Sequence, residues 1–387
     1  MMKICYVTTI SISIKSFFIP QLKFLAKNGF DVSVICSPDE ELQGLLGEKI
    51  HYIPVKIPRG IDLKGSFEAI RVLTRLFKKE QFDLVQYSTP NAALYASIAA
   101  KKARIKVRNY HLMGLRYLGE QGIKRKVLRC LERISCKKST HIECVSPSNL
   151  TLAIKEKLFK KEKGTVVWNG SSGGVDLSRF SCENSLKWRE EKRREYQLGQ
   201  TDFVYGFVGR ITRDKGIEEL LAAFKMVGEQ KESAKLVLIG AIDTEHGLSE
   251  GCLQTIEQGE NIIHIQQKAD IEKYYPMFDV LVLPSYREGF GNVVIEAQAM
   301  GVPVIVSDIP GPIDAIVNGQ TGVKVPVKDI DQLVNAMKQA WTFADQGFGE
   351  NAVKFVTMQF DSNILCEKIL QRKCALLNKN NRQDVGL

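Results

Sequence analysis

The sequence lacks any run of about 18 uninterrupted apolar residues, so we expect no membrane-spanning helix. It also lacks a Cys-x-x-Cys pair, although it contains nine cysteines. The usual zinc sites are therefore not indicated, and the odd, scattered set gives no sign of a disulfide framework. Single cysteines of this kind are typical of small buried residues in a reducing cytoplasm.

Two further absences narrow the class of protein. Gly289 and Gly291 form a Gly-x-Gly pair without a third glycine, so the nicotinamide-binding fingerprint is absent. No short internal repeat or low-complexity tract is present. The chain has 387 residues, of which 44% are hydrophobic and 25% charged. This is the composition of an ordinary soluble globular protein, and the length predicts two domains.

The amino terminus superficially resembles a signal peptide, because Lys3 precedes an apolar stretch. The competing interpretation is a buried strand over residues 3–7, followed by a polar Thr/Ser loop and a helix from about Ser16. We favour the strand, because no small-residue cleavage site follows and because residues 31–36 complete a strand–helix–strand unit.

Strand-like segments alternate with helical patterns along the chain, which predicts mainly parallel sheets covered by helices. One set is expected at about 3–7, 31–36, 51–55, 82–87, 105–109, 141–145 and 165–168, and a second at about 203–209, 235–240, 262–265, 279–284, 302–306 and 322–325. The predicted fold class is α/β, with two doubly wound, Rossmann-like domains over 1–175 and 176–360. The expected joint is Gly/Ser-rich at 169–174 and charged up to Arg194.

Two carboxylates, Glu288 and Glu296, straddle an expected boundary between a loop and a helix. A buried strand is expected before them and a packed helix after them. Gly291, Asn292 and Val293 should then present helix-start N–H groups, which favour an anion. Carboxylates repel phosphate but suit sugar hydroxyls. The expected ligand therefore carries both groups, as a nucleotide sugar does.

A second loop carries the cations that such a ligand needs. An apolar strand is expected to end at Gly209, and an apolar helix face begins at Ile217. Arg210 and Lys215 therefore lie at the carboxyl end of a strand, where open α/β sheets bind their ligands. The planar fork of Arg210 and the point charge of Lys215 both suit a diphosphate.

Residues 207–217 and 284–304 resemble the two signature segments of the retaining GT-B glycosyltransferases of family GT4, and they occur in the family's order. The resemblance covers nearly the whole chain and is sharpest over about 203–224 and 279–326. It implies two domains that face each other across a cleft, the first on the acceptor side and the second binding the nucleotide-sugar donor. It also implies that the C-terminal helical segment 361–387 crosses back onto the first domain.

The same resemblance implies roles for individual residues. Arg210 and Lys215 would neutralise the departing diphosphate, Glu296 would bind ribose hydroxyls and Glu288 would bind hydroxyls of the donor sugar. His111 matches the active-site histidine of the family and would hydrogen-bond near the reacting carbon. The rest of the donor pocket would be formed by Gly209, Gly289, Phe290, Gly291, Asn292 and Val293.

The resemblance implies no divalent metal and no separate cofactor, because arginine, lysine and helix N-termini stabilise the leaving diphosphate, which we expect to be UDP. Asp329 and Asp331 form the Asp-x-Asp pattern that holds a metal in other glycosyltransferases. Here the pattern precedes the apolar positions Leu333, Ala336 and Met337. We therefore interpret it as the N-terminal cap of a helix.

Two segments refine the resemblance. Many family members carry adjacent glycines in the first strand–helix loop, whereas residues 8–13 of this chain are threonine, serine and isoleucine. The backbone contacts that those glycines permit are not carried over to this chain. Residues 169–180 resemble the interdomain stretch of bacterial polysaccharide and lipid-linked oligosaccharide transferases.

Charge is divided unevenly. Residues 1–170 contain 30 Lys and Arg and 14 Asp and Glu, hence +16, and the remainder carries −6 of the total of +10. Basic runs at 101–108 and 124–138 would attract an anionic surface, and we favour a membrane. Nucleic acid is the rival polyanion, but no recognition motif of the usual kinds is visible. Residues 15–27, where lysines alternate with apolar residues, are either a core helix or one that rests on a bilayer.

We therefore expect a cytoplasmic enzyme, peripheral at the inner face of the bacterial plasma membrane. It would move a sugar, with retained anomeric configuration, from a UDP-sugar to a lipid-linked saccharide. Two other classes stay open. A GT-B-fold nucleotide-sugar epimerase or phosphorylase would keep the diphosphate site but lack an acceptor surface. A non-catalytic polyanion-binding protein would explain the charge but not the two loops.

Overall fold

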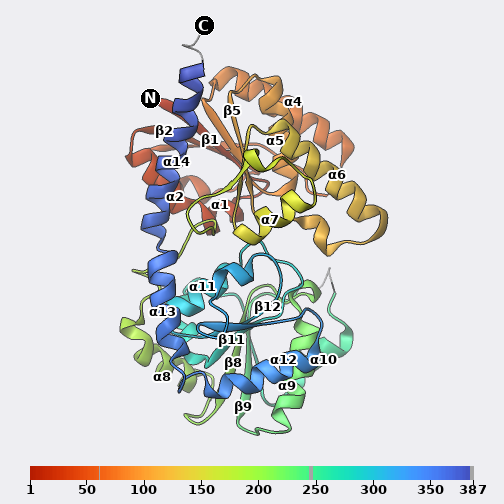
Figure 1. Ribbon diagram of the computed structural model, residues 1–387, viewed down its shortest axis with the longest axis vertical. Helices are drawn as coiled ribbons and strands as arrows, with labels where there is room; N and C mark the ends of the chain where they lie inside the picture. The colour runs from red at the N-terminus through yellow and green to blue at the C-terminus, as the bar shows by residue number, and fades with distance from the viewer. Residues whose placement is uncertain (61, 244–246, 384–387) are drawn as a thin grey trace. The chain divides into compact units, whose positions relative to one another are not determined.

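The computed structural model describes residues 1–60, 62–243 and 247–383. The chain forms two compact units: Met1–Gly173 together with the C-terminal helix, and Gly174–Asp361. Each unit is a parallel sheet covered by helices (Figure 1). The division lies two residues before the expected boundary at 175/176 and one residue after the expected boundary at 360/361.

The first unit contains a seven-stranded parallel sheet in the order β3-β2-β1-β4-β5-β6-β7. Its strands are β1 (Met2–Val7), β2 (Phe30–Cys36), β3 (Ile50–Pro54), β4 (Leu84–Tyr87), β5 (Val107–Leu112), β6 (His141–Cys144) and β7 (Gly164–Val166). Its helices are α1 (Ser11–Phe17), α2 (Ile19–Lys27), α3 (Leu42–Leu46), α4 (Leu63–Glu80), α5 (Pro90–Lys102), α6 (Gly122–Lys138), α7 (Pro147–Lys155) and α14 (Ser362–Gln383).

Both faces of this sheet are buried, as the alternation of side chains along β1 shows. Cys5 and Val7 face one apolar core, and Ile4 and Tyr6 face the other. The first core is closed by α4, α5 and α6, and the second by α2, α3 and α14. Because a parallel sheet with helices on both faces has no solvated side, its central strands are apolar throughout.

The amino-terminal segment forms the strand that we favoured, because β1 pairs with β2 and β4 in the middle of the sheet. The helix expected from about Ser16 is instead two helices, beginning at Ser11 and at Ile19. Phe18, Leu22 and Leu25 are fully buried, so the core interpretation of this segment is confirmed. Among the described residues, no helix is both long enough and apolar enough to cross a membrane.

All nine cysteines lie within the described residues, and none of them forms a disulfide. Five are buried, at Cys5, Cys36, Cys136, Cys144 and Cys366. Burial raises the pKa of the Cys36 thiol to about 11, so this side chain behaves as a small apolar residue.

A buried polar network fastens α14 to the first sheet. The Lys373 ammonium, 1% exposed, donates to Glu143 Oε2 at 2.8 Å and to Gln86 Oε1 at 2.6 Å. Asn109 Nδ2 donates to the same Glu143 oxygen at 2.8 Å. Burial acts to raise the pKa of Glu143, but Lys373 and these hydrogen bonds outweigh it and lower the pKa to about 2. Burial lowers the pKa of Lys373, and the charge and hydrogen bond of Glu143 oppose this shift.

The second unit contains a six-stranded parallel sheet in the order β10-β9-β8-β11-β12-β13. Its strands are β8 (Phe203–Val208), β9 (Ala234–Ile239), β10 (Ile262–Ile265), β11 (Val280–Leu283), β12 (Val304–Ser307) and β13 (Gly322–Val325). Its helices are α8 (Ser185–Glu195), α9 (Ile217–Gly228), α10 (Glu250–Gln258), α11 (Asn292–Ala299), α12 (Ile330–Gln339) and α13 (Phe348–Gln359).

The charged segment up to Arg194, which we expected to belong to the joint, is helix α8 of the second unit. Two of its three arginines are structural. Arg193 Nη2 donates to Asp279 Oδ2 at 2.7 Å, and Arg189 Nη2 donates to the other oxygen of the same carboxylate at 2.5 Å. The prediction failed because a run of charged residues looks like a solvated linker, whereas here Arg193 is 5% exposed and paired.

Replacing Lys373 with Met should lower the free energy of unfolding at pH 7 by about 3–5 kcal/mol, because Glu143 is then buried without its main counter-charge. Urea titration measures this. Since Glu143 has a lowered pKa in the folded state, the contribution is complete above its unfolded pKa of about 4.3 and is lost as the pH falls toward 2.

Arg372→Met is the matched control, because Arg372 contacts the same carboxylate at 3.2 Å but its side chain is 28% exposed. It should cost about 1 kcal/mol or less. Adding Glu143→Gln to Lys373→Met should restore part of the loss, since an amide needs no counter-charge. Equal costs for Lys373→Met and Arg372→Met would contradict the importance of the buried pair.

Candidate functional site

The strand order of the second unit reverses between β8 and β11. From β8 the chain moves outward through β9 to β10, and from β11 it moves the other way to β13. Two loops therefore leave neighbouring strands at the same edge of the sheet before the chain turns in opposite directions, and this is the place where open α/β sheets form the crevice that binds their ligands. The loop after β8 carries Arg210 and Lys215, and the loop after β11 carries Glu288.

The loop after β8 is short and shaped by glycine. Gly209 has a φ of +149°, and its N–H donates to the Ile239 carbonyl at 3.0 Å. Arg210 follows with a side chain that is 63% exposed, and its guanidinium lies 3.5 Å from the Asp243 carboxylate. Its guanidinium is therefore available at the crevice. A turn of 3-10 helix over Arg213–Lys215 then places Lys215 next to Gly216, which is the N-cap of α9.

The two loops are held against each other at several points. Gly216 has a φ of +71°, and a Cβ at this position would lie 2.2 Å from the carbonyl oxygen of Pro284. Next to this contact, the Tyr286 N–H donates to the Asp214 carbonyl at 2.9 Å. Arg287 pairs with the Asp214 carboxylate at 2.8 Å. The first loop therefore cannot shift without the second.

This joining brings Lys215 and Glu288 together. Lys215 Nζ lies 2.5 Å from Glu288 Oε1, and the two side chains are 18% and 13% exposed. Ser285 Oγ, itself fully buried, donates to the same oxygen at 2.9 Å. An ammonium, which suits a phosphate, and a carboxylate, which suits hydroxyl groups, thus stand side by side at the switch point.

Helix α11 starts at the same crevice. Gly291, at its N-cap, has a φ of +89°, and Asn292 is its first residue. The N-terminus of this helix is favourable for an anion because of its backbone N–H groups and dipole. Val293 is partly exposed, whereas Phe290 is buried with its ring 5.3 Å from that of Phe360. The Phe290 side chain therefore anchors the loop, and only its backbone is left to line the site.

A third loop supports the one that carries Glu288. Gly311 has a φ of +106°, and a Cβ there would lie 2.6 Å from the Gly289 carbonyl oxygen. The glycine is required because the two backbones approach so closely. Gly311 was not among the predicted site residues; its only signal in the sequence is its position between two prolines.

Glu296 lies in the first turns of α11 and faces a different partner from Glu288. Its Oε2 accepts a hydrogen bond from the Tyr275 hydroxyl at 2.7 Å. Burial raises the pKa of Glu296, and the Tyr275 hydrogen bond and the charge of Arg179 oppose this. Arg179 is itself paired with Glu272 at 2.6 Å. The sequence interpretation assigned no role to Tyr275 or Arg179. Tyr275 lies outside the two segments that resemble the family's signatures, and Arg179 lies in 169–180, which was interpreted only as an interdomain stretch.

His111 belongs to the first unit, apart from the residues above. It lies within strand β5, one residue before the strand ends, rather than after the strand as expected. Its Nε2 is 3.3 Å from Ser172 Oγ, and its ring is 5.5 Å from that of Phe18. Burial lowers the pKa of His111 to about 4, partly opposed by the charge of Glu143. The imidazole is therefore neutral at pH 7 and suited to hydrogen bonding.

The switch point of the first unit lies between β1 and β4, and the loops that follow these two strands are hydrogen-bonded to each other. Thr9 Oγ1 and Thr89 Oγ1 are 2.7 Å apart, and the Thr9 N–H donates to Thr89 Oγ1 at 3.1 Å. Thr89 has a φ of +65° at the N-cap of α5. The threonine and serine loop that replaces the family's glycines thus binds the neighbouring loop directly.

The Asp-x-Asp segment is a helix cap, as predicted. Asp329 is the N-cap of α12, and its Oδ1 accepts a hydrogen bond from the Gln332 N–H at 3.0 Å. Asp331 follows in the first turn of the same helix. Over residues 1–60, 62–243 and 247–383, no group of three or more His, Cys, Asp or Glu side chains is arranged to hold a metal ion.

Comparisons with known proteins match both units. Residues 188–352 match the family "Glycosyl transferases group 1", and residues 3–146 match "Glycosyl transferase 4-like". The chain is 36% identical to the capsular polysaccharide biosynthesis glycosyltransferase CapM of Staphylococcus aureus, over 95% of each chain. It is 26% identical to the Escherichia coli UDP-Gal:alpha-D-GlcNAc-diphosphoundecaprenol alpha-1,3-galactosyltransferase, over 82% of this chain and 81% of the relative.

Solved structures share the fold. Anabaena Alr3699/HepE in complex with UDP and glucose superposes with a TM-score of 0.79 at 17% identity, over 97% of this chain and 100% of that one. The architecture of two Rossmann-like domains is therefore that of the GT-B fold. The matched region 188–352 contains every predicted site residue of the second unit.

Gly216→Ala should lower the affinity for the nucleotide-sugar donor and the rate of sugar transfer by about tenfold to a hundredfold, because the added Cβ forces Lys215 away from the loop that carries Glu288. Isothermal titration and an activity assay measure the two effects. Gly228→Ala, at the other end of α9, is the control, since nothing lies within 4 Å of a Cβ there. Equal behaviour of the two variants would show that the contact with Pro284 does not position the site.

Proposed function

The chain belongs to the GT4 family of GT-B glycosyltransferases, and from this we propose that it transfers a sugar, with retained configuration, from a UDP-sugar to a lipid-linked saccharide in bacterial surface polysaccharide synthesis. The names of the relatives support the proposal: one acts in capsular polysaccharide biosynthesis, and another transfers galactose from UDP-Gal to a diphosphoundecaprenol-linked sugar. UDP in complex with a protein of the same fold is consistent with the proposed donor.

The observation that carries the proposal is the Lys215–Glu288 pair at the switch point of the second unit. We assign the Lys215 ammonium and the Arg210 guanidinium to the diphosphate, together with the N-terminus of α11. Charge grows on the diphosphate as it departs, and preorganised cations stabilise that charge most. The pair holds Lys215 in place before the donor arrives, so little reorganisation is needed.

The carboxylates take the hydroxyl groups of the donor. Glu288 has one oxygen bonded to Lys215 and Ser285, and we assign the other to hydroxyls of the donor sugar. Glu296 would bind the ribose hydroxyls, once its contact with Tyr275 rearranges or is shared. The backbone of Gly209 and of residues 289–293 would form the remaining walls of the pocket.

The proposed reaction needs no covalent enzyme intermediate. The bond from the sugar's anomeric carbon to the diphosphate oxygen breaks, and the acceptor hydroxyl oxygen bonds to the same face of that carbon. The hydroxyl proton passes to the departing diphosphate. The pair formed by Glu288 and Glu296 is therefore not that of a glycosidase, in which one carboxylate protonates the leaving group. Neutral His111 would donate or accept a hydrogen bond near the reacting carbon.

Metal independence is part of the proposal. The predicted diphosphate site is built from Arg210, Lys215 and a helix N-terminus, which together supply the positive charge that Mg²⁺ supplies elsewhere. The Asp329 side chain is occupied in capping α12. No protein-bound cofactor is needed for the transfer, because the donor itself is the activated species.

Membrane association is the remaining part. The first unit, with the C-terminal segment from Ser362, holds 35 Lys and Arg and 16 Asp and Glu, hence +19, whereas the second unit carries −9. A lipid-linked acceptor lies at a membrane surface, and basic residues near anionic lipid contribute about 1 kcal/mol each. We therefore place the enzyme at the inner face of the plasma membrane, with the first unit on the acceptor side.

Lys215→Ala and Arg210→Ala should each lower turnover by about tenfold to a thousandfold, the range for loss of a charged transition-state contact. Steady-state kinetics with a UDP-sugar measure the effect. Lys225→Ala is the control, because Lys225 is an exposed lysine on the neighbouring helix α9. Lys215→Ala combined with Glu288→Gln should stay slow, since removing the unpaired carboxylate does not restore the cation. Near-normal transfer by the Arg210→Ala/Lys215→Ala variant would rule out the assigned diphosphate site.

Activity should survive excess EDTA at an unchanged rate, because protein cations stabilise the leaving diphosphate. The assay follows UDP release that depends on the acceptor, which also separates transfer from epimerase or phosphorylase activity. A loss of activity with EDTA that Mg²⁺ or Mn²⁺ restores would contradict metal independence. In that case Asp329→Asn and Asp331→Asn would locate the metal.

A further inference from the structure

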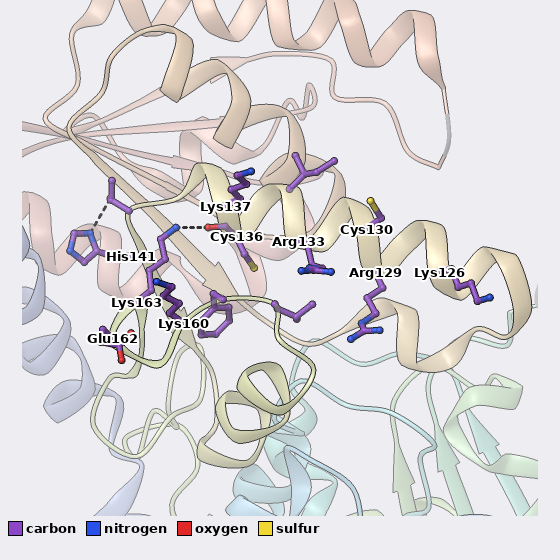
Figure 2. A pocket seen from close by; sticks show the side chains of 14 residues that line it. Lys126, Arg129, Cys130, Arg133, Cys136, Lys137, His141, Lys160, Glu162 and Lys163 are labelled. Carbon is purple, nitrogen blue, oxygen red and sulfur yellow. Dashed lines mark hydrogen bonds between the residues drawn. The ribbon is translucent and has the colours of Figure 1, made fainter.

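A basic groove lies in the first unit beside β6, which is the third strand from β1 in the sheet. Figure 2 shows the side chains that line it. The groove has a volume of about 840 Å³ and runs between α6 and the segment 158–163, which connects α7 to β7. Six cationic side chains line it: Lys126, Arg129, Arg133, Lys137, Lys160 and Lys163. Glu162 is the one acidic residue of its lining.

Most of these cations are not committed to partners within the protein. Arg129 pairs with Glu156 at 2.8 Å, and Lys163 Nζ donates to the Cys136 carbonyl at 2.7 Å. Within the described part of the chain, no ion pair within 4 Å involves the other four, which are Lys126, Arg133, Lys137 and Lys160. Like charges gathered in this way repel one another, and an anionic ligand would relieve the repulsion.

Apolar residues also line the groove, and we call them its floor. They are Cys130 and Ile134 of α6 and Leu158 and Phe159 of the segment 158–163. Leu158 is 5% exposed and belongs to the apolar core of the unit. Cationic walls on an apolar floor suit a ligand that has a phosphate group next to a hydrocarbon chain. A free sugar phosphate or a nucleotide would leave this floor uncovered.

The apolar floor continues out of the groove along one face of α6. Ile123, Val127, Cys130 and Ile134 are spaced by four, three and four residues, which places them in one stripe of the helix. Ile123 is 80% exposed and Val127 is 42% exposed. The stripe therefore leads from exposed apolar side chains at the start of α6 into the groove.

Cations accompany this stripe. Lys126, Arg129, Arg133 and Lys137 follow one another along the same helix in Figure 2, with Lys160 and Lys163 on the facing segment. A helix with exposed apolar residues beside lysine and arginine is the arrangement that lies at a membrane interface. Here the interface helix also forms one wall of a groove.

We propose that this groove binds a single phosphate-bearing lipid. Arg133, Lys137 and Lys160 hold its phosphate group, and Ile134 with Phe159 receives the first carbons of its chain. This proposal rests on the membrane association proposed above and makes it more specific. The net charge of the first unit accounts only for a general attraction to anionic lipid, whereas the groove would be a discrete binding site. A guanidinium with two ammonium groups matches the oxygens of a phosphate better than those of a neutral headgroup.

The test compares three soluble probes by isothermal titration: dihexanoylphosphatidylglycerol below its micelle concentration, glycerophosphoglycerol and inorganic diphosphate. We expect saturable one-to-one binding of the lipid, at least about tenfold tighter than of either other probe, because only the lipid reaches the apolar floor. Equal affinity for glycerophosphoglycerol or diphosphate would overturn the lipid assignment and leave an anion site.

The variants compare equal changes of charge. Arg133→Glu/Lys137→Glu should weaken lipid binding at least about tenfold, whereas Arg71→Glu/Arg75→Glu, at exposed positions of α4, should change it less than about twofold. An equal loss of lipid affinity in both variants would show that the lipid is attracted by the overall charge, and would overturn the proposed binding site in the groove. Ile134→Ser should weaken binding of the lipid but not of diphosphate, and equal lipid binding by this variant would contradict the role of the floor.

Two controls keep the outcomes separate. The affinity for UDP should stay within about twofold of the wild-type value in every variant, because the donor loops belong to the second unit. If a variant lost both lipid and UDP binding, it would be unfolded. The lipid affinity would then be compared with that of Arg133→Gln/Lys137→Gln. Failure of the wild-type protein to bind UDP would defeat the proposed function without touching the groove. Single-stranded DNA is a further probe. If the wild-type protein bound it as tightly as the lipid, and if Arg133→Glu/Lys137→Glu abolished that binding, the ligand of the groove would be nucleic acid instead of a lipid.

Discussion

The contact between the loops after β8 and β11 is the constraint on which the candidate donor site depends. Without the close approach of Gly216 to the Pro284 carbonyl, Lys215 could not reach Glu288, since the two residues are 73 positions apart in the chain. Strand order supplies the rest: because β8 and β11 are neighbours at a switch point, both loops emerge at one edge of the sheet. The Lys215 ammonium, which we assign to phosphate, and the Glu288 carboxylate, which we assign to hydroxyls, thereby lie side by side.

In the first unit, few of the many basic side chains are buried in ion pairs. One buried pair, Lys373 with Glu143, fastens the C-terminal helix to the sheet, and most of the other basic residues remain on the surface. A surface rich in unpaired cations destabilises a folded domain through repulsion, so a partner that supplies negative charge is the simplest account of it. The groove beside α6 concentrates this excess on an apolar floor, which a membrane lipid suits. The net charge of −9 on the second unit would disfavour binding of that unit to the same anionic membrane surface.

Much of this arrangement could be predicted from the sequence. Apolar runs separated by helical patterns gave the strands of both sheets to within a few residues, and the motifs around Lys215 and Glu288 pointed to the correct family. The pairing of these two side chains could not be predicted, because it depends on strand order and on the loop contact at Gly216. Lys373 looks like a solvated residue in a polar helix, and only the position of Glu143 on β6 explains its burial. The basic residues of α6 could be recognised in the sequence as a charged run. The groove itself could not be predicted, because it forms where α6 lies beside residues 158–163.

The central claim is that the crevice between β8 and β11 is a diphosphate site. It rests on the positions of Arg210 and Lys215 and on the N-terminus of α11. Isothermal titration of uridine, UMP and UDP into the wild-type protein without metal tests it most directly. The account predicts that UDP binds at least about a hundredfold more tightly than UMP, or about 2.7 kcal/mol, because only UDP places a second phosphate between the two cations. Equal affinities for UMP and UDP would contradict it.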